Sequence, residues 1–351
     1  MFTETLTKRS KRSALLDLLT GPHGVDRYTE LVDPTWTRGQ GRARVIGVRR
    51  TTSRSVTLTL APNRAFTGFR AGQHINVSVE IDGRRRTRPY SPANGENEGN
   101  IELTIGRHDG GLMSTYLFEH ARPGMVVGLD SVGGDFTLPA SGVGRVLFVA
   151  GGSGITPVMS MLRTLRARRH TGEVVFVHYA RSADEACYRA ELAEIAYAMP
   201  NVTVLHGFTR NRIGSNLDGR FGREHVDIDP DAVYVCGPPS LVDAVREVFP
   251  EAQSESFVPP DFSASESTGG TVRFTASGQD VVDDGRPLLN QAEDAGLTPE
   301  SGCRMGICFS CTRRKTSGIV RNVVTGAVSS SEEEDVQICV SAPVGDVCID
   351  L

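Results

Sequence analysis

Hydrophobic and polar positions divide the chain into three stretches with different periods. In the first stretch, four short segments alternate apolar and polar residues or are rich in β-branched residues: ARVIGVRR, SVTLTLAP, HINVSVEI and IELTIGR. Gly, Pro and Asn bound these segments, which is typical of closely spaced strands in a small antiparallel barrel. We place this barrel at residues 41–141, after an N-terminal leader at residues 1–40.

The second stretch alternates continuous apolar strands with helical segments. RVLFVAG precedes a Gly-rich turn and the helical PVMSMLRTLRARR, and the same alternation continues through EVVFVHYA, VTVLHGF and AVYVCGP. Strand and helix in turn predict right-handed crossovers and a doubly wound parallel sheet, which we place at residues 142–250. Ligands of such sheets bind beyond the carboxyl ends of the strands.

The third stretch begins where periodicity is lost. Ser, Pro and Gly accumulate at residues 251–270, which predicts a linker. Residues 271–351 then contain a short strand, the helical PLLNQAEDAG, a cysteine-rich loop and further short strands. The predicted fold class is therefore multidomain, with an antiparallel β-barrel, a doubly wound α/β domain and a small α+β domain.

Composition is that of a globular protein, with 351 residues of which 39% are hydrophobic and 23% charged. No apolar run approaches the ~20 residues of a membrane helix, and the leader lacks a signal-peptide cleavage pattern. We therefore expect a cytoplasmic protein that is not itself transmembrane.

Charge is unevenly distributed along the chain. Residues 271–351 carry seven Arg and Lys against twelve Asp and Glu, a net charge of −5, which leaves +1 for the first 270 residues because the whole chain carries −4. An acidic end unit suggests docking to a basic partner rather than nucleic-acid binding, and a merely solvated face is the alternative.

Four cysteines carry the strongest chemical signal. Cys303, Cys308 and Cys311 follow the spacing C-x4-C-x2-C, and Cys339 comes after 27 further residues. This is the plant-type spacing of a [2Fe-2S] cluster. Structural zinc sites usually use two C-x2-C pairs or Cys/His mixtures, whereas one such pair is present here, and a disulfide conflicts with the expected compartment. The four cysteines are the predicted metal ligands.

Two motifs in the predicted barrel provide groups that a flavin needs. A flavin requires an aromatic ring against its isoalloxazine, a donor near N5, and cations with helix N-terminal amides for its phosphates. R-x-Y-S by itself is also compatible with an ordinary strand end. The candidate residues are Arg88, Pro89, Tyr90, Ser91, Gly111, Leu112, Met113 and Ser114.

The turns after the parallel strands are candidates for binding a pyridine dinucleotide. AGGSGITP follows the first of these strands and CGPP the fourth, although a Gly-rich turn is also compatible with a simple tight connection. Arginines after the second and third strands, Arg212 among them, suit a ribose 2′-phosphate, so NADPH is the favoured donor and NADH the alternative. The candidate residues are Gly151, Gly152, Ser153, Gly154, Thr156, Arg181, Ser182, Arg210, Cys236, Gly237 and Pro238.

The motifs and their order resemble ferredoxin-NADP reductase-like flavoproteins that carry a plant-type [2Fe-2S] ferredoxin domain at the C-terminus. GRPLLNQAEDAG through VQICVSAPVGDVCIDL resembles that ferredoxin domain, for which the resemblance implies a β-grasp fold. It also implies FAD, with FMN as the alternative. Tyr90, Ser91 and Cys236 are then expected at the reacting rings, Cys236 as a contact residue or simply a thiol that ends a buried strand. The segment ESF, at residues 255–257, resembles the acidic and aromatic end of the reductase module.

The resemblance implies electron transfer. A hydride carries two electrons and an iron-sulfur cluster accepts one at a time, so a flavin between them completes the chain. GPHGVDRYTELVDPTWT and RKTSGIVRNVVTGAVS further resemble the actinobacterial reductases of stearoyl-CoA desaturase. This implies NADPH-dependent transfer to a membrane di-iron fatty acyl desaturase or hydroxylase, with peripheral membrane association through that partner. The alternatives are a Rieske-type or steroid-ring oxygenase as acceptor and, in another class, a redox-sensing iron-sulfur flavoprotein.

Overall fold

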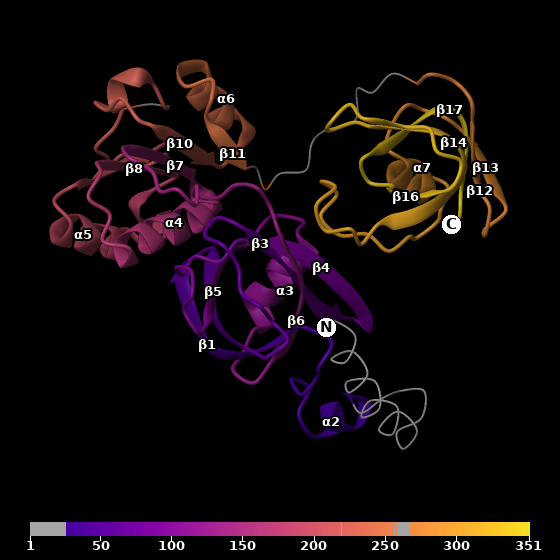
Figure 1. Cartoon of the computed structure of the whole chain (residues 1–351), viewed down its shortest axis with the longest axis horizontal. Helices are drawn as coiled ribbons and strands as arrows, with labels where there is room; N and C mark the ends of the chain where they lie inside the picture. The colour runs from indigo at the N-terminus through magenta and orange to yellow at the C-terminus, as the bar shows by residue number, and fades with distance from the viewer. Residues whose placement is uncertain (1–25, 219, 256, 258–266) are drawn as a thin grey trace, which may run out of the picture.

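The computed structural model describes residues 26–218, 220–255, 257 and 267–351, which form three units along the chain (Figure 1). The first unit contains α2 (Asp26–Val32), β1 (Arg42–Thr52), β2 (Ser55–Pro62), β3 (His74–Ile81), β4 (Arg84–Tyr90), β5 (Ile101–Gly106), α3 (Leu112–His120) and β6 (Val126–Gly133). The second contains β7 (Val146–Gly151), η2 (Gly152–Gly154), α4 (Ile155–Ala167), β8 (Val174–Ala180), η3 (Ala183–Glu185), α5 (Arg189–Ala198), β9 (Val202–Phe208), η4 (Arg223–His225), β10 (Ala232–Cys236), α6 (Pro239–Val248) and β11 (Gln253–Glu255). The third contains β12 (Thr271–Phe274), β13 (Gln279–Val282), α7 (Leu288–Asp294), β14 (Thr312–Asn322), β15 (Val328–Ser329), β16 (Glu334–Gln337) and β17 (Ser341–Ile349). Across these ranges, no helix has both the length and the apolar composition that crossing a bilayer requires.

The first unit is an antiparallel barrel, as the strand pattern predicts. Its six strands pair in the order β4-β3-β6-β1-β2-β5, and each pairing is antiparallel. The alternating apolar residues of these strands form its core, and Met113 and Leu117 of α3 pack into the same core. Ile75 of β3 pairs with Tyr90 of β4, so the RPYS motif lies where the last turn of β4 leaves the barrel.

The second unit is a parallel sheet in the order β11-β10-β7-β8-β9. The strands β7 and β8 are buried throughout because α4 and α5 pack on one face of the sheet and α6 on the other. The chain runs outward from β7 to β9 and then returns to β10 on the opposite side of β7. The strand order therefore reverses between β7 and β10, and their carboxyl ends form the topological switch point at which such sheets bind ligands.

The parallel sheet extends beyond its predicted end. Gln253, Ser254 and Glu255 form β11 and pair in parallel with β10, although this segment lies within the predicted linker at 251–270. A strand of three residues is too short for its alternation to differ from that of a polar loop. The nucleotide unit thus reaches Glu255.

The third unit is a mixed sheet with one helix. Its strands follow the order β13-β12-β17-β14-β15, with β16 also paired to β14, and the β12–β17 pairing is parallel. Leu288, Leu289 and Ala292 of α7 pack on the sheet against Phe274 and Val347. The third unit is therefore α+β, and its cysteine-rich loop lies between α7 and β14.

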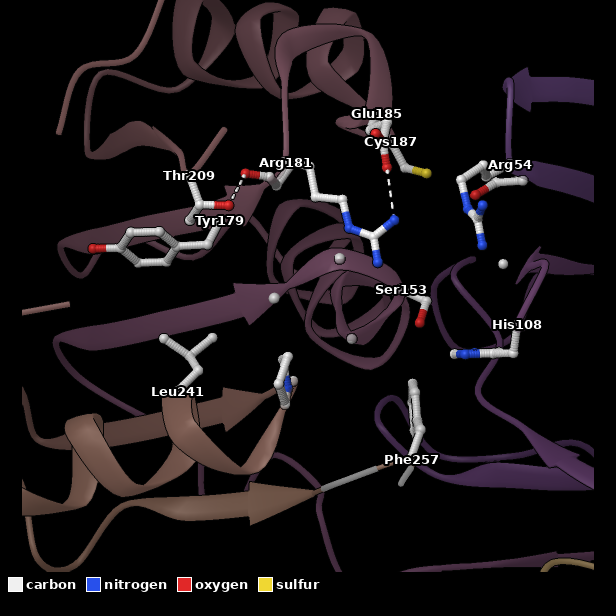
Figure 2. A pocket seen from close by; sticks show the side chains of 18 of the residues that line it. Arg54, His108, Ser153, Tyr179, Arg181, Glu185, Cys187, Thr209, Leu241 and Phe257 are labelled. Atoms are coloured by element: carbon white, nitrogen blue, oxygen red, sulfur yellow. Dashed lines mark hydrogen bonds and ion pairs between the residues drawn. The ribbon is translucent and has the colours of Figure 1, made fainter. Parts of the chain in front are cut away.

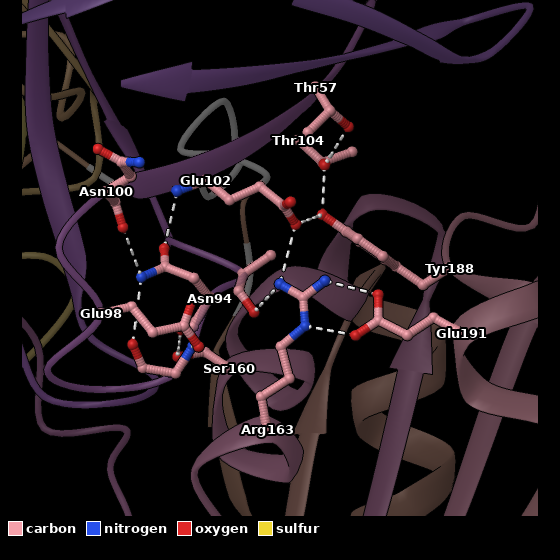
Figure 3. A network of polar contacts seen from close by, with 12 residues as sticks. Thr57, Asn94, Glu98, Asn100, Glu102, Thr104, Ser160, Arg163, Tyr188 and Glu191 are labelled. Atoms are coloured by element: carbon pink, nitrogen blue, oxygen red, sulfur yellow. Dashed lines mark hydrogen bonds and ion pairs between the residues drawn. The ribbon is translucent and has the colours of Figure 1, made fainter. Parts of the chain in front are cut away.

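A buried ionic network joins the barrel to the parallel sheet (Figure 3). Arg163 of α4 donates to the Glu102 carboxylate of β5 (2.9 Å) and, through two nitrogens, to Glu191 of α5 (2.6 and 2.7 Å). The hydroxyl of Tyr188 donates to Glu102 as well (3.1 Å). Burial by itself would lower the pKa of Arg163, but its hydrogen bonds with Glu191 and the charge of Glu102 outweigh burial and raise that pKa. The network fixes one domain against the other.

Replacing Arg163 with Met should destabilise the protein by about 3 kcal/mol, because Glu102 and Glu191 would remain partly buried without their cation. Urea unfolding followed by circular dichroism measures the effect. Arg145 offers a matched control, since its ion pairs with Asp229 and Asp231 are exposed, and Arg145→Met should change stability by less than about 1 kcal/mol. Equal effects of the two substitutions would contradict the assignment.

Candidate functional site

A cavity of about 520 Å³ lies at the switch point, between the parallel sheet and the barrel (Figure 2). The turn after β7 and the turn after β10 form its floor, and the barrel segment around His108 forms the opposite wall. The two turns approach so closely that a Cβ atom on Gly154 would lie 2.3 Å from the carbonyl oxygen of Cys236, and one on Gly151 would lie 2.7 Å from Pro238 Cδ. Only glycine fits there, and the turns present backbone amides to the cavity.

The structure distributes the predicted dinucleotide residues unequally. Gly151, Gly152, Ser153, Gly154, Arg181, Gly237 and Pro238 line the cavity. Thr156 is buried behind it, where its hydroxyl donates to Ser153 O (3.3 Å). Ser182, Arg210 and Arg212 are not among the lining residues, and Arg212 instead pairs with Asp218 (3.6 Å).

Other cations at the cavity come from places that no motif marks. Arg54 follows the β1–β2 turn of the barrel, and Arg220 lies in the segment between β9 and β10. Both line the cavity together with Arg181, which pairs with Glu185 (3.8 Å). Three guanidinium groups in one cavity suit a polyanionic ligand. Neither Arg54 nor Arg220 has a local pattern that would have identified it.

The RPYS motif forms a second surface at the rim of the barrel. Tyr90 is half-buried and packs against the barrel core, and burial raises the pKa of its hydroxyl. Arg88 donates to Thr87 O (2.8 Å), and burial lowers the pKa of its guanidinium. Ser91 is 3% exposed, and its Oγ has no hydrogen-bond partner in the described part of the chain. A buried hydroxyl without a partner fits a site that a polar ligand atom completes.

The helix α3 begins at the second predicted flavin motif. Gly111 precedes its first residue, Leu112, and the Ser114 hydroxyl accepts a hydrogen bond from His108 N (3.3 Å). Met113 is buried in the barrel core, whereas Leu112 is 49% exposed. The first turn of α3 therefore combines a free helix N-terminus with a hydrophobic anchor, which suits a phosphate-bearing ligand.

Cys236 ends β10 beside the nucleotide turn. It is fully buried, and burial together with the nearby Glu255 charge raises the pKa of its thiol well above the ordinary value. A neutral, buried thiol is a poor nucleophile. This placement agrees with the interpretation of Cys236 as a contact residue, which stays a prediction.

The cysteine-rich loop directs backbone amides at its thiols. Cys303 N donates to Cys308 Sγ (3.1 Å), and the amides of Met305 and Ile307 donate to Cys303 Sγ (3.3 and 3.4 Å). Left-handed φ angles of 59° at Arg304 and 76° at Gly306 turn these amides inward. All four predicted ligand cysteines are at most 8% exposed. Such amide–sulfur bonds stabilise thiolates bound to metal.

The four thiols form two pairs. Cys303 donates to Cys308, which lowers the pKa of Cys308 to about 5 and raises that of Cys303. Cys339 donates to Cys311, which lowers the pKa of Cys311 and raises that of Cys339. In the residues that the structure describes, no three His, Cys, Asp or Glu side chains converge on one metal-ion position. Two pairs fit a two-metal group that takes two thiolates per metal better than one tetrahedral ion.

The cysteine loop faces the rim of the barrel. Met305 and Ile307 line a second cavity of about 520 Å³ together with His74 of β3 and Glu255 of β11. His74 is 4% exposed, and its Nδ1 lies 3.7 Å from Glu255 Oε1. The charges of Cys308 and Cys303 reach Arg88 and oppose the effect of burial on its pKa. The loop, the RPYS motif and the end of the parallel sheet thus meet at one junction.

Models of two domain families match the first two units. The Oxidoreductase FAD-binding domain matches residues 49–137, and the Oxidoreductase NAD-binding domain matches residues 148–247. These ranges contain the RPYS motif and both turns of the dinucleotide cavity.

Relatives match nearly the whole chain. An NADPH oxidoreductase from Mycobacterium tuberculosis is 36% identical over 95% of this chain and 90% of the relative. The glycine betaine monooxygenase reductase subunit from Pseudomonas aeruginosa is 29% identical over 90% of this chain and 96% of the relative. Among solved structures, phthalate dioxygenase reductase has a TM-score of 0.59 at 24% identity, covering 88% of this chain and 97% of that structure, which shows a shared fold.

Replacing Ser91 with Ala should slow reduction of the bound flavin by NADPH at least about 10-fold, because a buried donor aimed at the reacting ring would be lost. Stopped-flow bleaching of the flavin measures this rate. Ser160→Ala is the matched control, since the equally buried Ser160 hydroxyl already donates to Asn94 O (2.6 Å) at the domain interface. A wild-type reduction rate in Ser91→Ala would refute the role of Ser91.

Proposed function

Because this chain belongs to the ferredoxin-NADP reductase-like family of FAD- and NAD-binding oxidoreductases, we propose that it passes electrons from NADPH, through FAD and a [2Fe-2S] cluster, to a separate oxygenase or desaturase. Bound FAD supplies the exchange between a two-electron donor and a one-electron acceptor, and the cluster supplies the one-electron outlet. The observation that carries the proposal is the paired arrangement of four buried thiols on a loop that faces the barrel rim.

The residues around the cysteines support a cluster. A Cβ on Gly302 would lie 2.3 Å from Cys308 Sγ, so only glycine allows the backbone this close to the sulfur. Three amide donors already point at Cys303 and Cys308. Cys303, Cys308, Cys311 and Cys339 would hold the cluster in a ferredoxin-like β-grasp unit, and Met305 and Ile307 would lie on its barrel side.

The residues of the barrel and sheet support a flavin between nucleotide and cluster. Tyr90 would pack against the isoalloxazine, Ser91 would donate near its reacting edge, and Arg88 with the first turn of α3 would bind its phosphates. Cys236 and the Gly151–Gly154 turn would position the nicotinamide across the crevice. Each group orients or approaches a ligand, so no side chain needs to act as a nucleophile.

The cations in the dinucleotide cavity favour NADPH over NADH. Arg181 lies at the carboxyl end of β8, where the second strand of such sheets meets the adenosine ribose. Arg54 and Arg220 add positive charge to the same cavity. A 2′-phosphate would meet these guanidinium groups, whereas a free 2′-hydroxyl would leave them unmatched.

The acceptor is proposed at two levels. Relatives include reductase components of glycine betaine monooxygenase, propane 2-monooxygenase and 1,2-phenylacetyl-CoA epoxidase, which supports an oxygenase-type acceptor. Within that class we propose a membrane di-iron fatty acyl desaturase or hydroxylase, because the leader and the segment after the cysteine loop resemble the reductases of stearoyl-CoA desaturase. A Rieske-type or steroid-ring oxygenase is the alternative.

Replacing Cys308 with Ser should abolish NADPH-driven reduction of cytochrome c through the cluster by at least about 10-fold, because one iron loses a thiolate ligand. Reduction of ferricyanide directly from the flavin should stay within about twofold of wild type. Cys348→Ser is the matched control, since Cys348 lies on β17 outside the four-thiol set. The visible spectrum reports cluster loss separately, and an unchanged spectrum in Cys308→Ser would contradict the proposal.

Replacing Arg181 with Ala should raise the KM for NADPH about 10-fold and leave the KM for NADH nearly unchanged, because only NADPH carries the phosphate that Arg181 would bind. Steady-state dye reduction with each nucleotide measures both constants. Arg212→Ala, which alters an arginine outside the cavity lining, should change neither. An equal rise for both nucleotides would assign Arg181 to a part that they share.

A further inference from the structure

Three large apolar side chains are exposed at the N-terminal edge of the described chain. Leu31 is 82% exposed, Val32 74% and Trp36 58%. Leu31 and Val32 end α2, and Trp36 follows one turn later. Single exposed apolar residues are common on soluble proteins, but three large ones within six positions form a patch. We call these three residues the N-terminal apolar patch.

Polar contacts hold the segment that carries the patch firmly on the barrel. Glu30 pairs with Arg42 (3.1 Å) and Asp33 with Arg44 (2.7 Å), both arginines belonging to β1. The Asn63 side-chain amide donates to Thr35 O (3.1 Å). These contacts anchor the backbone on both sides of the patch, while its side chains point away from the barrel. The exposure is therefore a property of the anchored conformation.

The same contacts set the direction of the patch. Figure 1 shows α2 projecting from the barrel at the side away from the parallel sheet and α6. The residues that line the dinucleotide cavity and the junction at the cysteine loop do not include Leu31, Val32 or Trp36. A surface bound to the patch would thus leave both sites free.

Charge at this end of the chain opposes the charge of the whole protein. Lys8, Arg9, Lys11 and Arg12 lie within five positions, although the protein carries a net charge of −4. The apolar segment ALLDLL follows this run before α2 begins. A basic run beside apolar residues complements an anionic surface with an apolar interior, and it lies in the sequence just before the exposed patch.

We propose that the N-terminal apolar patch, together with the basic run, binds the surface of an anionic lipid bilayer. Trp is the side chain most suited to the boundary between headgroups and acyl chains, and Leu31 and Val32 add apolar area beside it. Stable peripheral binding needs two signals, apolar insertion and electrostatic attraction, and this end of the chain offers both. The inference concerns a direct contact of this chain with lipid and does not rest on the identity of the electron acceptor.

Trp36 makes the proposal directly measurable because it is the only tryptophan of the chain. Full-length protein is mixed with vesicles of phosphatidylcholine alone or with about one-third phosphatidylglycerol, and Trp36 emission and sedimentation with the vesicles are recorded. With anionic vesicles, emission should shift to shorter wavelength and lipids brominated on their acyl chains should quench it. Binding should weaken as salt is raised, because salt screens the basic run.

Variants separate the two signals. Val32→Glu should weaken association with anionic vesicles at least about 10-fold because it places a charge in the apolar interface. Lys11→Glu should weaken it about 10-fold or more, since it removes one attractive charge and adds a repulsive one. Val282→Glu is the matched control, because Val282 is 82% exposed on β13 of the third unit, and it should bind like wild type. NADPH-dependent ferricyanide reduction without vesicles should be unchanged in all three.

Other occupants of the patch would overturn the proposal. If residues 1–25 cover it, Trp36 emission will be at short wavelength without lipid, will ignore vesicles, and will shift to longer wavelength when those residues are deleted. If a second copy covers it, emission and sedimentation will depend on protein concentration and not on lipid. If a protein acceptor binds there, Val32→Glu will impair transfer to that acceptor while wild type fails to bind anionic vesicles.

Discussion

The arrangement of the sites depends on the ionic contact between the barrel and the parallel sheet. Arg163 donates to carboxylates from two other elements, Glu102 and Glu191, and its Nη1 also donates to Ala93 O (2.9 Å) (Figure 3). Partly buried charges of this kind contribute little net stability, but they tolerate few alternative geometries. The contact therefore acts mainly as an orienting device, which places the rim of the barrel opposite the carboxyl ends of the strands.

Close backbone packing refines this orientation at the switch point. The turn after β7 lies against the turn after β10, and Gly154 is the residue that permits it because any side chain there would collide with Cys236 O. The dinucleotide cavity is consequently bounded by backbone on its sheet side and by side chains such as Arg54 and His108 on its barrel side (Figure 2). Neither domain alone forms a complete binding surface.

The third unit meets the other two in a different way. At its junction, Met305 and Ile307 face His74 and Glu255 across a cavity, without the dense ion pairing of the barrel–sheet interface. On the same loop, Phe309 is 66% exposed and has a left-handed φ of 58°. The cysteine loop thus has one side toward the barrel rim and another toward solvent. Electron transfer through a cluster in this loop requires access on both sides, from the flavin and to an acceptor.

The sequence by itself determined the features that leave a local record. Alternation of period two predicted the barrel strands, continuous apolar runs predicted the parallel sheet, and cysteine spacing predicted the four-thiol set, because burial and turn geometry act on neighbouring residues. The tertiary structure alone decided which distant groups meet. Arg54 and Arg220 join Arg181 in one cavity, β11 completes the sheet, and Leu31, Val32 and Trp36 face outward. These outcomes depend on how domains pack and which side chains find partners, and no short stretch of sequence contains that information.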